Sequence, residues 1–228
     1  MRIEVTTALS HRELLQRIEN KSITSEELLQ EVKKDSNVIA AIIGGTASLK
    51  PGIRYGSSKA LMDLSGACPE RLYPFMDSFT ALLGSKYRIL VWNALAIIAN
   101  LAKVDENKKF DDIFDKYYSF LDDPYMVTVA NTVGNSAKIA FGKPYLIDRI
   151  VNELLRVENI AITPHLTEEC KRVIAEKAVE SFDILFDEIQ DKDRVVLFVK
   201  GYVGSSRKTL RLKAESFLKK RGIEPIQD

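Results

Sequence analysis

Few residues in this chain have the type and spacing that enzyme chemistry needs. The 228 residues include two histidines, His11 and His165, and two cysteines, Cys68 and Cys170. The cysteines form no CxxC pair, and two histidines would need unusually placed carboxylates to complete a zinc site. We therefore expect no disulfide framework, no metal site and no cofactor.

The glycines do not complete a nucleotide-binding motif. Gly201 to Gly204 and the pair Gly44–Gly45 lack the flanking strand and the remaining glycines of a phosphate-binding loop. The sequence contains no GxSxG nucleophile elbow and no HExxH motif. Acidic pairs such as Asp111–Asp112 and Glu168–Glu169 fall at expected helix starts, where carboxylates favour the positive end of the helix dipole. The sequence predicts a protein that is not an enzyme.

One band of polar residues has the pattern of a binding surface. Spacings of three and four residues place its members on one face of successive helices. Asparagine carries a donor and an acceptor, so it can pair with the main chain of an extended peptide. The candidate partner-binding residues are Lys59, Asp63, Asn93, Asn100, Asn131, Asn135, Lys138 and Lys177. The alternative is that these asparagines bond to neighbouring helices or to water.

Cations gather near the C-terminus, although the whole chain carries a net charge of only +1. Arg207, Lys208 and Arg211 form a candidate anion-binding surface. The alternative is that they form the polar outer face that the last helix of a repeat array needs for solubility. No aromatic residue interleaves with these cations, which weakens the case for single-stranded nucleic acid as a partner.

The candidate residues belong to a repeated pair of helices. One set, the A helices, is indicated by apolar spacings of three and four residues near 38–42, 72–83, 110–121, 147–157 and 195–202. The second set, the B helices, is aligned on Ala60, Ala94, Thr132, Ala178 and Ala214. The B helix near Trp92 is apolar almost all round, so we expect it to be covered on several sides and Trp92 to be packed.

Turn and cap residues delimit these helices. Thr24 and Glu27 form a predicted capping box of a helix that precedes the array. Pro124 is expected at an early position of the third B helix, and Ser206 is expected to cap the last one. Asn159 to Thr167 is a predicted insertion. We expect an all-α fold, a right-handed superhelix (solenoid) of about five two-helix repeats.

The repeat resembles a HEAT repeat, with armadillo-like repeats as close neighbours. The resemblance lies in Ile53-Arg54-Tyr55…Lys59-Ala60-Leu61 and Tyr87-Arg88…Asn93-Ala94-Leu95 and covers about residues 35–222. It implies a basic residue at the start of each B helix, at Arg54, Arg88, Arg172 and Lys208, paired with an acid in the adjoining turn; Met126 departs from this pattern. It also implies that the B helices line a concave surface. We expect residues 1–35 to form an N-terminal helical cap and residues 36–228 to form the array, within one structural domain.

The primary hypothesis is a non-enzymatic scaffold that binds a protein or peptide segment on the concave face. The alternative is nucleic-acid binding, since HEAT-like alkylpurine DNA glycosylases also use two-helix repeats, with aromatic, acidic and arginine residues at the lesion. Trp92 is the only tryptophan here, and no acid follows it before Asp105, which departs from that pattern. With no signal peptide and no apolar run long enough to span a bilayer, we expect a cytoplasmic protein without a membrane partner; the oligomeric state is left open.

Overall fold

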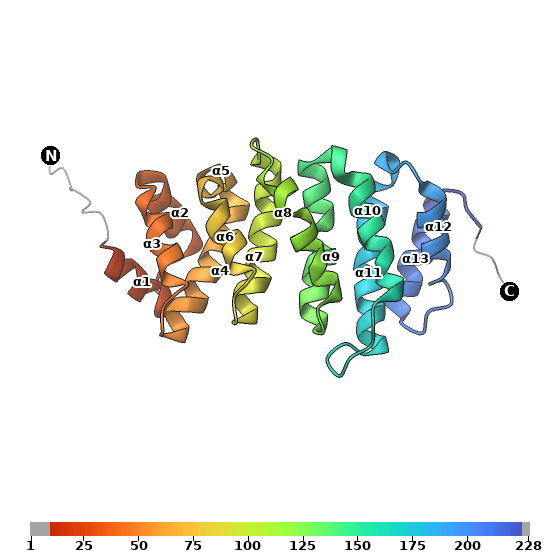
Figure 1. Ribbon diagram of the computed structural model, residues 1–228, viewed down its shortest axis with the longest axis horizontal. Coiled ribbons are helices and arrows are strands. Elements are labelled where there is room, and N and C mark those ends of the chain that lie inside the picture. The colour runs from red at the N-terminus through yellow and green to blue at the C-terminus, as the bar shows by residue number, and fades with distance from the viewer. Residues whose placement is uncertain (1–9, 225–228) are drawn as a thin grey trace. The chain divides into compact units, whose positions relative to one another are not determined.

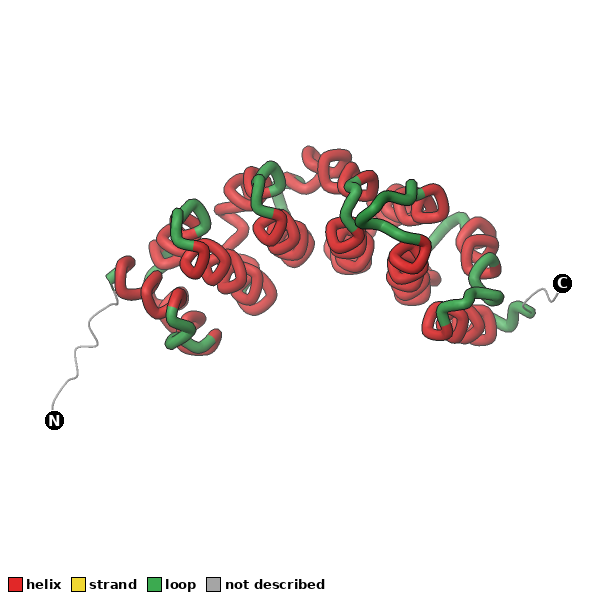
Figure 2. Tube along the Cα trace, turned by 90° about the horizontal axis from the view of Figure 1, so that it is seen from below, coloured by secondary structure: helices red, strands yellow, loops and turns green. Residues whose placement is uncertain are grey.

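A computed structural model describes residues 10–224 of the chain. Over these residues the backbone is helical, and it forms no strand beyond an isolated bridge between Thr163 and Leu166 (Figure 2). The contacts group into two compact units, Met1–Val104 and Asp105–Asp228. The predicted cap, of which residues 1–9 lie outside the described range, belongs to the first unit. The predicted division at residue 35 within a single domain stays a prediction.

The first unit alternates short A helices with longer B helices (Figure 1). Its elements are α1 (His11–Glu19), α2 (Ser25–Lys34), α3 (Asn37–Gly45), α4 (Pro51–Ala67), α5 (Pro69–Leu72), η1 (Tyr73–Phe75), α6 (Met76–Leu82), α7 (Arg88–Leu101) and η2 (Ala102–Val104). The predicted capping box is present, because the Thr24 side chain accepts from the Glu27 N–H while the Glu27 carboxylate accepts from the Thr24 N–H. B helices α4 and α7 pack side by side.

The predicted A helix over 72–83 is interrupted. It divides into α5, η1 and α6, with Pro74 inside the 3₁₀ turn. Proline has no N–H to donate, and its ring clashes with the carbonyl four residues earlier, so a continuous α-helix cannot pass through it. The apolar stripe nevertheless survives, because Leu72, Met76 and Phe79 are fully buried.

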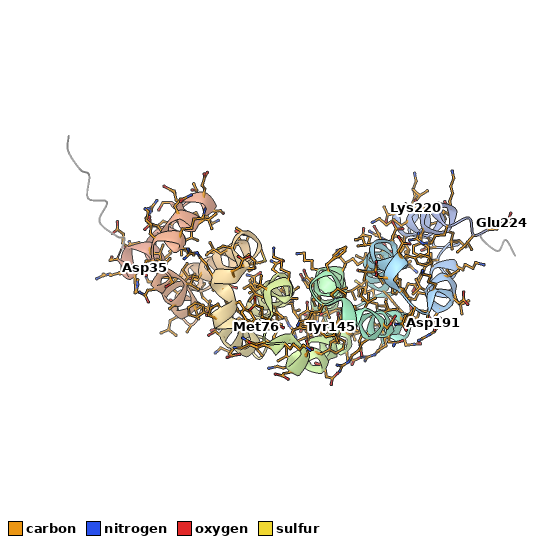
Figure 3. All side chains as sticks on the ribbon, turned by 90° about the horizontal axis from the view of Figure 1, so that it is seen from above. Asp35, Met76, Tyr145, Asp191, Lys220 and Glu224 are labelled. Atoms are coloured by element: carbon orange, nitrogen blue, oxygen red, sulfur yellow. The ribbon has the colours of Figure 1, made fainter. Side chains whose placement is uncertain are left out.

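The second unit continues the alternation. Its elements are α8 (Lys109–Tyr118), η3 (Ser119–Asp122), α9 (Met126–Gly142), η4 (Pro144–Leu146), α10 (Ile147–Leu155), η5 (Arg156–Asn159), α11 (Glu168–Leu185), η6 (Phe186–Glu188), α12 (Lys192–Lys200) and α13 (Lys208–Lys220). B helix α11 packs between B helices α9 and α13. Figure 3 shows Asp191, the N-cap of A helix α12, and Lys220, at the end of B helix α13, on opposite sides of the last helix pair.

Two predicted helix starts are wrong by one or two residues. Pro124 precedes α9, whose N-cap is Tyr125, because the insertion holds this segment: the Thr163 hydroxyl donates to the Pro124 carbonyl at 2.7 Å, and the His165 ring stacks on Tyr125 at 4.4 Å. Ser206 does not cap α13. The N-cap is Arg207, whose own N–H donates to the Ser205 hydroxyl at 3.3 Å.

The hydrophobic cores follow the predicted apolar faces. In the second unit, Phe110, Phe114, Tyr117 and Tyr118 form one aromatic cluster with ring centroids 4.6–6.0 Å apart. Because these rings are fully buried, they contribute a large part of the apolar area that this unit removes from water. In the first unit, α7 buries most of its side chains as expected, while Trp92 is half-buried.

Candidate functional site

Lys59 and Asp63 lie on the same exposed face of α4. Their side chains form an i,i+4 ion pair with 2.6 Å between the Lys59 Nζ and an Asp63 carboxylate oxygen. This pair lies in a groove of the first unit, which we call the α4 groove. It has a cavity volume of about 640 Å³ and is lined by Ile18, Glu19, Lys21, Ile23, Thr24, Ser25, Leu28, Pro51, Gly52, Tyr55, Gly56, Lys59, Ala60, Asp63, Leu64 and Ala67.

The α4 groove runs along the whole of α4. Its α4 lining positions begin at Pro51 and end at Ala67, and they form neighbouring pairs that recur every four residues, as one face of a helix must. The opposite wall comes from the end of α1, the turn after it and the start of α2. Most of the lining is apolar, and its charged members are Glu19, Lys21, Lys59 and Asp63.

Glycines on α4 let α1 pack closely and form one wall of this groove. A Cβ atom at Gly56 would lie 2.8 Å from the Ile18 Cγ2, so only glycine lets α1 pack this closely against α4. A Cβ atom at Gly52 would lie 3.1 Å from the Glu19 Cγ. Glu19 in turn pairs with Lys50 at 3.6 Å. Lys59 and Asp63 are predicted from the sequence, but the groove is not. Its available signal is the series Gly52, Gly56 and Ala60 at four-residue spacing.

Asn93 and Asn100 tie α7 to α4. The Asn93 amide donates to the Ser58 hydroxyl at 2.8 Å, and the Asn100 amide donates to the Ser65 hydroxyl at 2.9 Å. Both serines are fully buried. Asn93 and Asn100 therefore bond to a neighbouring helix, as the alternative interpretation of the asparagines states.

The other four candidate residues lie in the second unit. Asn131 and Asn135 donate to carbonyls of their own helix α9, at Val127 and Asn131, over 2.8 and 2.9 Å. Lys177 of α11 lies against Gly134 of α9, whose added Cβ would meet the lysine stem at 3.4 Å. Lys138 is exposed on α9. The predicted band is thus divided between the two units.

The cations of α13 face an acidic row on α11. Arg207 pairs with Glu169 at 2.7 Å and with Glu176 at 2.8 Å. Lys213 pairs with Glu176 and Glu180, and both Lys220 and Arg221 pair with Asp183. Of the other predicted anion-binding residues, Arg211 donates to the Ser205 carbonyl at 3.1 Å and Lys208 is exposed.

Glu176 is the centre of this ion-pair row. Burial pushes the pKa of its carboxyl upward, but hydrogen bonds from Lys213, Thr209 and Arg207 outweigh burial and lower the pKa to about 2. The sequence-based expectation for these cations does not include the acids of α11. The available signal is the spacing of Glu169, Glu176, Glu180 and Asp183, which puts four acids on one helix face one repeat before the cations.

The basic residues that open the B helices differ from the family expectation. Arg54 is buried and donates to the carbonyls of Ser48 and Leu49 at 2.8 and 3.3 Å, so it binds the turn through its backbone and not through an acid. Its guanidinium also lies 3.8 Å from the centre of the Tyr87 ring. Arg172 pairs with Glu169 of its own helix at 2.9 Å. Pairing with a turn acid is therefore wrong for Arg54 and Arg172.

Within residues 10–224, no three His, Cys, Asp or Glu side chains are grouped closely enough to hold a metal ion. Across the same described range, no helix has the length and apolar character needed to cross a membrane.

The chain is similar to solved structures of designed repeat proteins. No family model and no curated protein matches the sequence. A designed armadillo repeat protein shares 15% identity at a TM-score of 0.59, over 93% of this chain and 95% of that one. A second designed armadillo repeat protein, solved in complex with the peptide (KR)4, shares 14% identity at a TM-score of 0.60, over 93% of this chain and 95% of that one. A structure of computationally designed armadillo repeat proteins for modular peptide recognition shares 14% identity at a TM-score of 0.60, over 92% of this chain and 94% of that one. The chain therefore has the fold of an armadillo- or HEAT-like helical-repeat solenoid.

Proposed function

We propose that the protein is a non-enzymatic interaction scaffold that binds a segment of a partner protein on its B-helix face. The observation that carries this proposal is the α4 groove, an apolar concavity that contains the candidate residues Lys59 and Asp63. A groove of this length and composition fits a chain segment better than it fits a polar small molecule, because most of its lining offers apolar contact.

The structural neighbours support the same class of function. One was solved with a bound peptide, and another was designed for peptide recognition. Peptide binding by proteins of this fold makes a protein partner the first choice for this chain. The candidate residues of the second unit, Asn131, Asn135, Lys138 and Lys177, are proposed as a further contact surface. Free cysteines at Cys68 and Cys170 fit the proposed cytoplasmic location, where thiols stay reduced.

The ion pairs of α13 weigh against the nucleic-acid alternative. Phosphate binding requires cations that are free to replace counterions. Arg207, Lys213 and Lys220 already face carboxylates of α11, so α13 offers far less net positive charge than its sequence indicates.

Peptide display on the full-length chain tests the proposal. A library of random 18-residue peptides is panned against the wild-type protein, and each selected peptide is then measured against Ala60→Trp, which fills the α4 groove. Ala40→Trp on the exposed side of α3, outside the groove lining, is the matched control. We expect selected peptides to lose roughly tenfold or more in affinity with Ala60→Trp and to bind Ala40→Trp as they bind the wild type.

Two results would count against this function. Selected peptides that bind Ala60→Trp as tightly as the wild type would place binding outside the α4 groove. Failure to select any peptide with a Kd below the millimolar range would remove segment binding at this face. Circular dichroism of both tryptophan variants checks that each remains folded.

A further inference from the structure

We propose that the α4 groove takes the apolar face of an amphipathic α-helix that carries a carboxylate near one end. The proposal rests on the proposed function and names the partner's chemistry.

The shape of the groove matches a helix. The lining residues of α4 extend from Pro51 to Ala67, about 24 Å at 1.5 Å per residue, which is the length of a helix of about 16 residues. Gly52, Gly56 and Ala60 recur at four-residue spacing on this face. Gly52 and Gly56 let α1 pack closely against α4, so that α1 forms a wall beside this face, and a partner helix would lie along α4 next to that wall.

The backbone of the walls gives an extended peptide little to bind. The groove is walled by α1, α2 and α4, whose N–H and C=O groups are paired within their own helices except at the ends. At the start of α2, the Thr24 side chain already accepts from the Glu27 N–H. The candidate asparagines, which could hold an extended main chain, lie on α7 and α9 and are absent from the lining. A partner helix, which satisfies its own backbone, suits these walls.

The charged residues of the groove indicate which charge a complementary partner carries. Of the four charged lining residues, Lys59 pairs with Asp63 and Glu19 pairs with Lys50. Lys21 is exposed and makes no ion pair with any residue in the described range 10–224. It follows the end of α1 with φ of 55°, at one end of the groove. A partner with an uncharged apolar stripe and one carboxylate opposite Lys21 is therefore complementary to the groove.

The volume of about 640 Å³ also lies within the usual range of small-ligand pockets, roughly 300–1,000 Å³. A fatty acid is the small molecule that best combines an apolar body with a carboxylate. Palmitate therefore belongs in the test as a competing occupant, although its single thin chain would leave a groove about 24 Å long and walled by three helices only partly filled.

Two display libraries test the inference. The first holds 18-residue peptides with a Glu/Lys/Ala background and randomised residues at i, i+3, i+4, i+7 and i+11; the second is fully random. Selected peptides are measured by fluorescence anisotropy against wild type, Ala60→Trp, Ala40→Trp and Lys21→Glu, and again after a proline is placed at their centre. We expect the helical library to supply the tight binders. The central proline and the Ala60→Trp substitution should each lower their affinity tenfold or more. Lys21→Glu should cost about two- to fivefold, only for peptides with a terminal acid.

The outcomes separate this inference from the proposed function. One outcome is that all binders come from the random library, tolerate the central proline and still lose affinity with Ala60→Trp. This would overturn the inference that the partner is helical and leave the proposed segment binding intact. If neither library yields a peptide whose affinity falls with Ala60→Trp, both the helix inference and the proposed function are overturned. Palmitate binding that Ala60→Trp abolishes, without any peptide binding, would assign the groove to a lipid and overturn both. If Lys21→Glu leaves the affinity of peptides with a terminal acid unchanged, the inference that the partner places a carboxylate opposite Lys21 is overturned.

Discussion

The Nζ atom of Lys143 lies 2.8 Å from a carboxylate oxygen of Asp105, and both side chains are buried in the second unit. Asp105 also accepts the N–H groups of Lys109 and Phe110 at 2.9 and 2.8 Å. Lys143 is the C-cap residue of α9, and Lys109 begins α8. One carboxylate therefore joins the end of a B helix to the start of the A helix before it.

Replacing Lys143 should destabilise the protein strongly. Lys143→Met keeps the apolar stem but leaves the Asp105 carboxylate buried without its cation. We expect the free energy of unfolding to fall by about 3–5 kcal/mol, as for other buried pairs that lose one partner. Urea unfolding followed by circular dichroism measures it. Lys219→Met, at an exposed position of α13, should change stability by less than about 0.5 kcal/mol; equal effects of both variants would show that the buried pair contributes nothing.

The same pair makes stability depend on alkaline pH. Burial alone would lower the pKa of Lys143, but its hydrogen bonds to Asp105, Tyr145 and Asp111 outweigh burial and raise the pKa. A raised pKa stabilises the folded state fully below the unfolded value of about 10.4, and the contribution is lost as pH rises through the folded pKa. The stability difference between wild type and Lys143→Met should thus stay constant from pH 6 to 9 and shrink above about pH 10.5. A difference that grows with pH would contradict the raised pKa.

Glu176 should give the opposite dependence. Its pKa of about 2 is below the unfolded value of about 4.3, so its contribution is present above pH 4.3 and lost as pH falls through about 2. Glu176→Gln should lower the free energy of unfolding by roughly 1–3 kcal/mol at pH 7, and the two curves should converge between pH 4 and 2. Glu188→Gln, at an exposed position, is the control. A difference that persists unchanged at pH 2 would place the loss outside this carboxyl.

The bond between Asn93 and Ser58 predicts a structural role for this asparagine. Asn93→Ala leaves the buried Ser58 hydroxyl without this partner, so we expect a loss of about 1–2 kcal/mol in unfolding free energy. A double-mutant cycle with Ser58→Ala should give a coupling of about 0.5–1.5 kcal/mol. A coupling near zero would return Asn93 to the list of residues available to a partner.

Much of the fold was predictable, because each helix of a solenoid buries a stripe against its immediate neighbours. The stripe spacing of three and four residues is a local property, so the fully buried Phe79, Phe114 and Phe198 mark three A helices in the sequence itself. Helix ends depend on single residues and their contacts. Pro74 breaks α5 from α6 by its own chemistry, whereas the start of α9 depends on contacts from a distant insertion that no local pattern reveals.

The candidate site was less predictable, because a side chain's partner lies one repeat away. Asn93 and Ser58 are separated by 35 residues, and Arg207 and Glu169 by 38. Helical periodicity places each residue on a face, but it does not say whether that face meets the next helix or solvent. The α4 groove depends on missing side chains at Gly52 and Gly56, and their meaning appears only once α1 is seen against α4.

Gly56 therefore gives the sharpest test of the groove's wall. Gly56→Ala places a Cβ 2.8 Å from the Ile18 Cγ2, a methyl group on a stiff β-branched side chain, so α1 must shift. We expect a loss of about 1–2 kcal/mol in unfolding free energy, despite the better helix propensity of alanine. Gly44→Ala is the matched control, because no atom lies within 4 Å of its added Cβ, and it should gain about 0.5–1 kcal/mol. If both variants stabilise the protein equally, α1 does not pack on Gly56 in solution, and the α4 groove loses the wall on which helix binding depends.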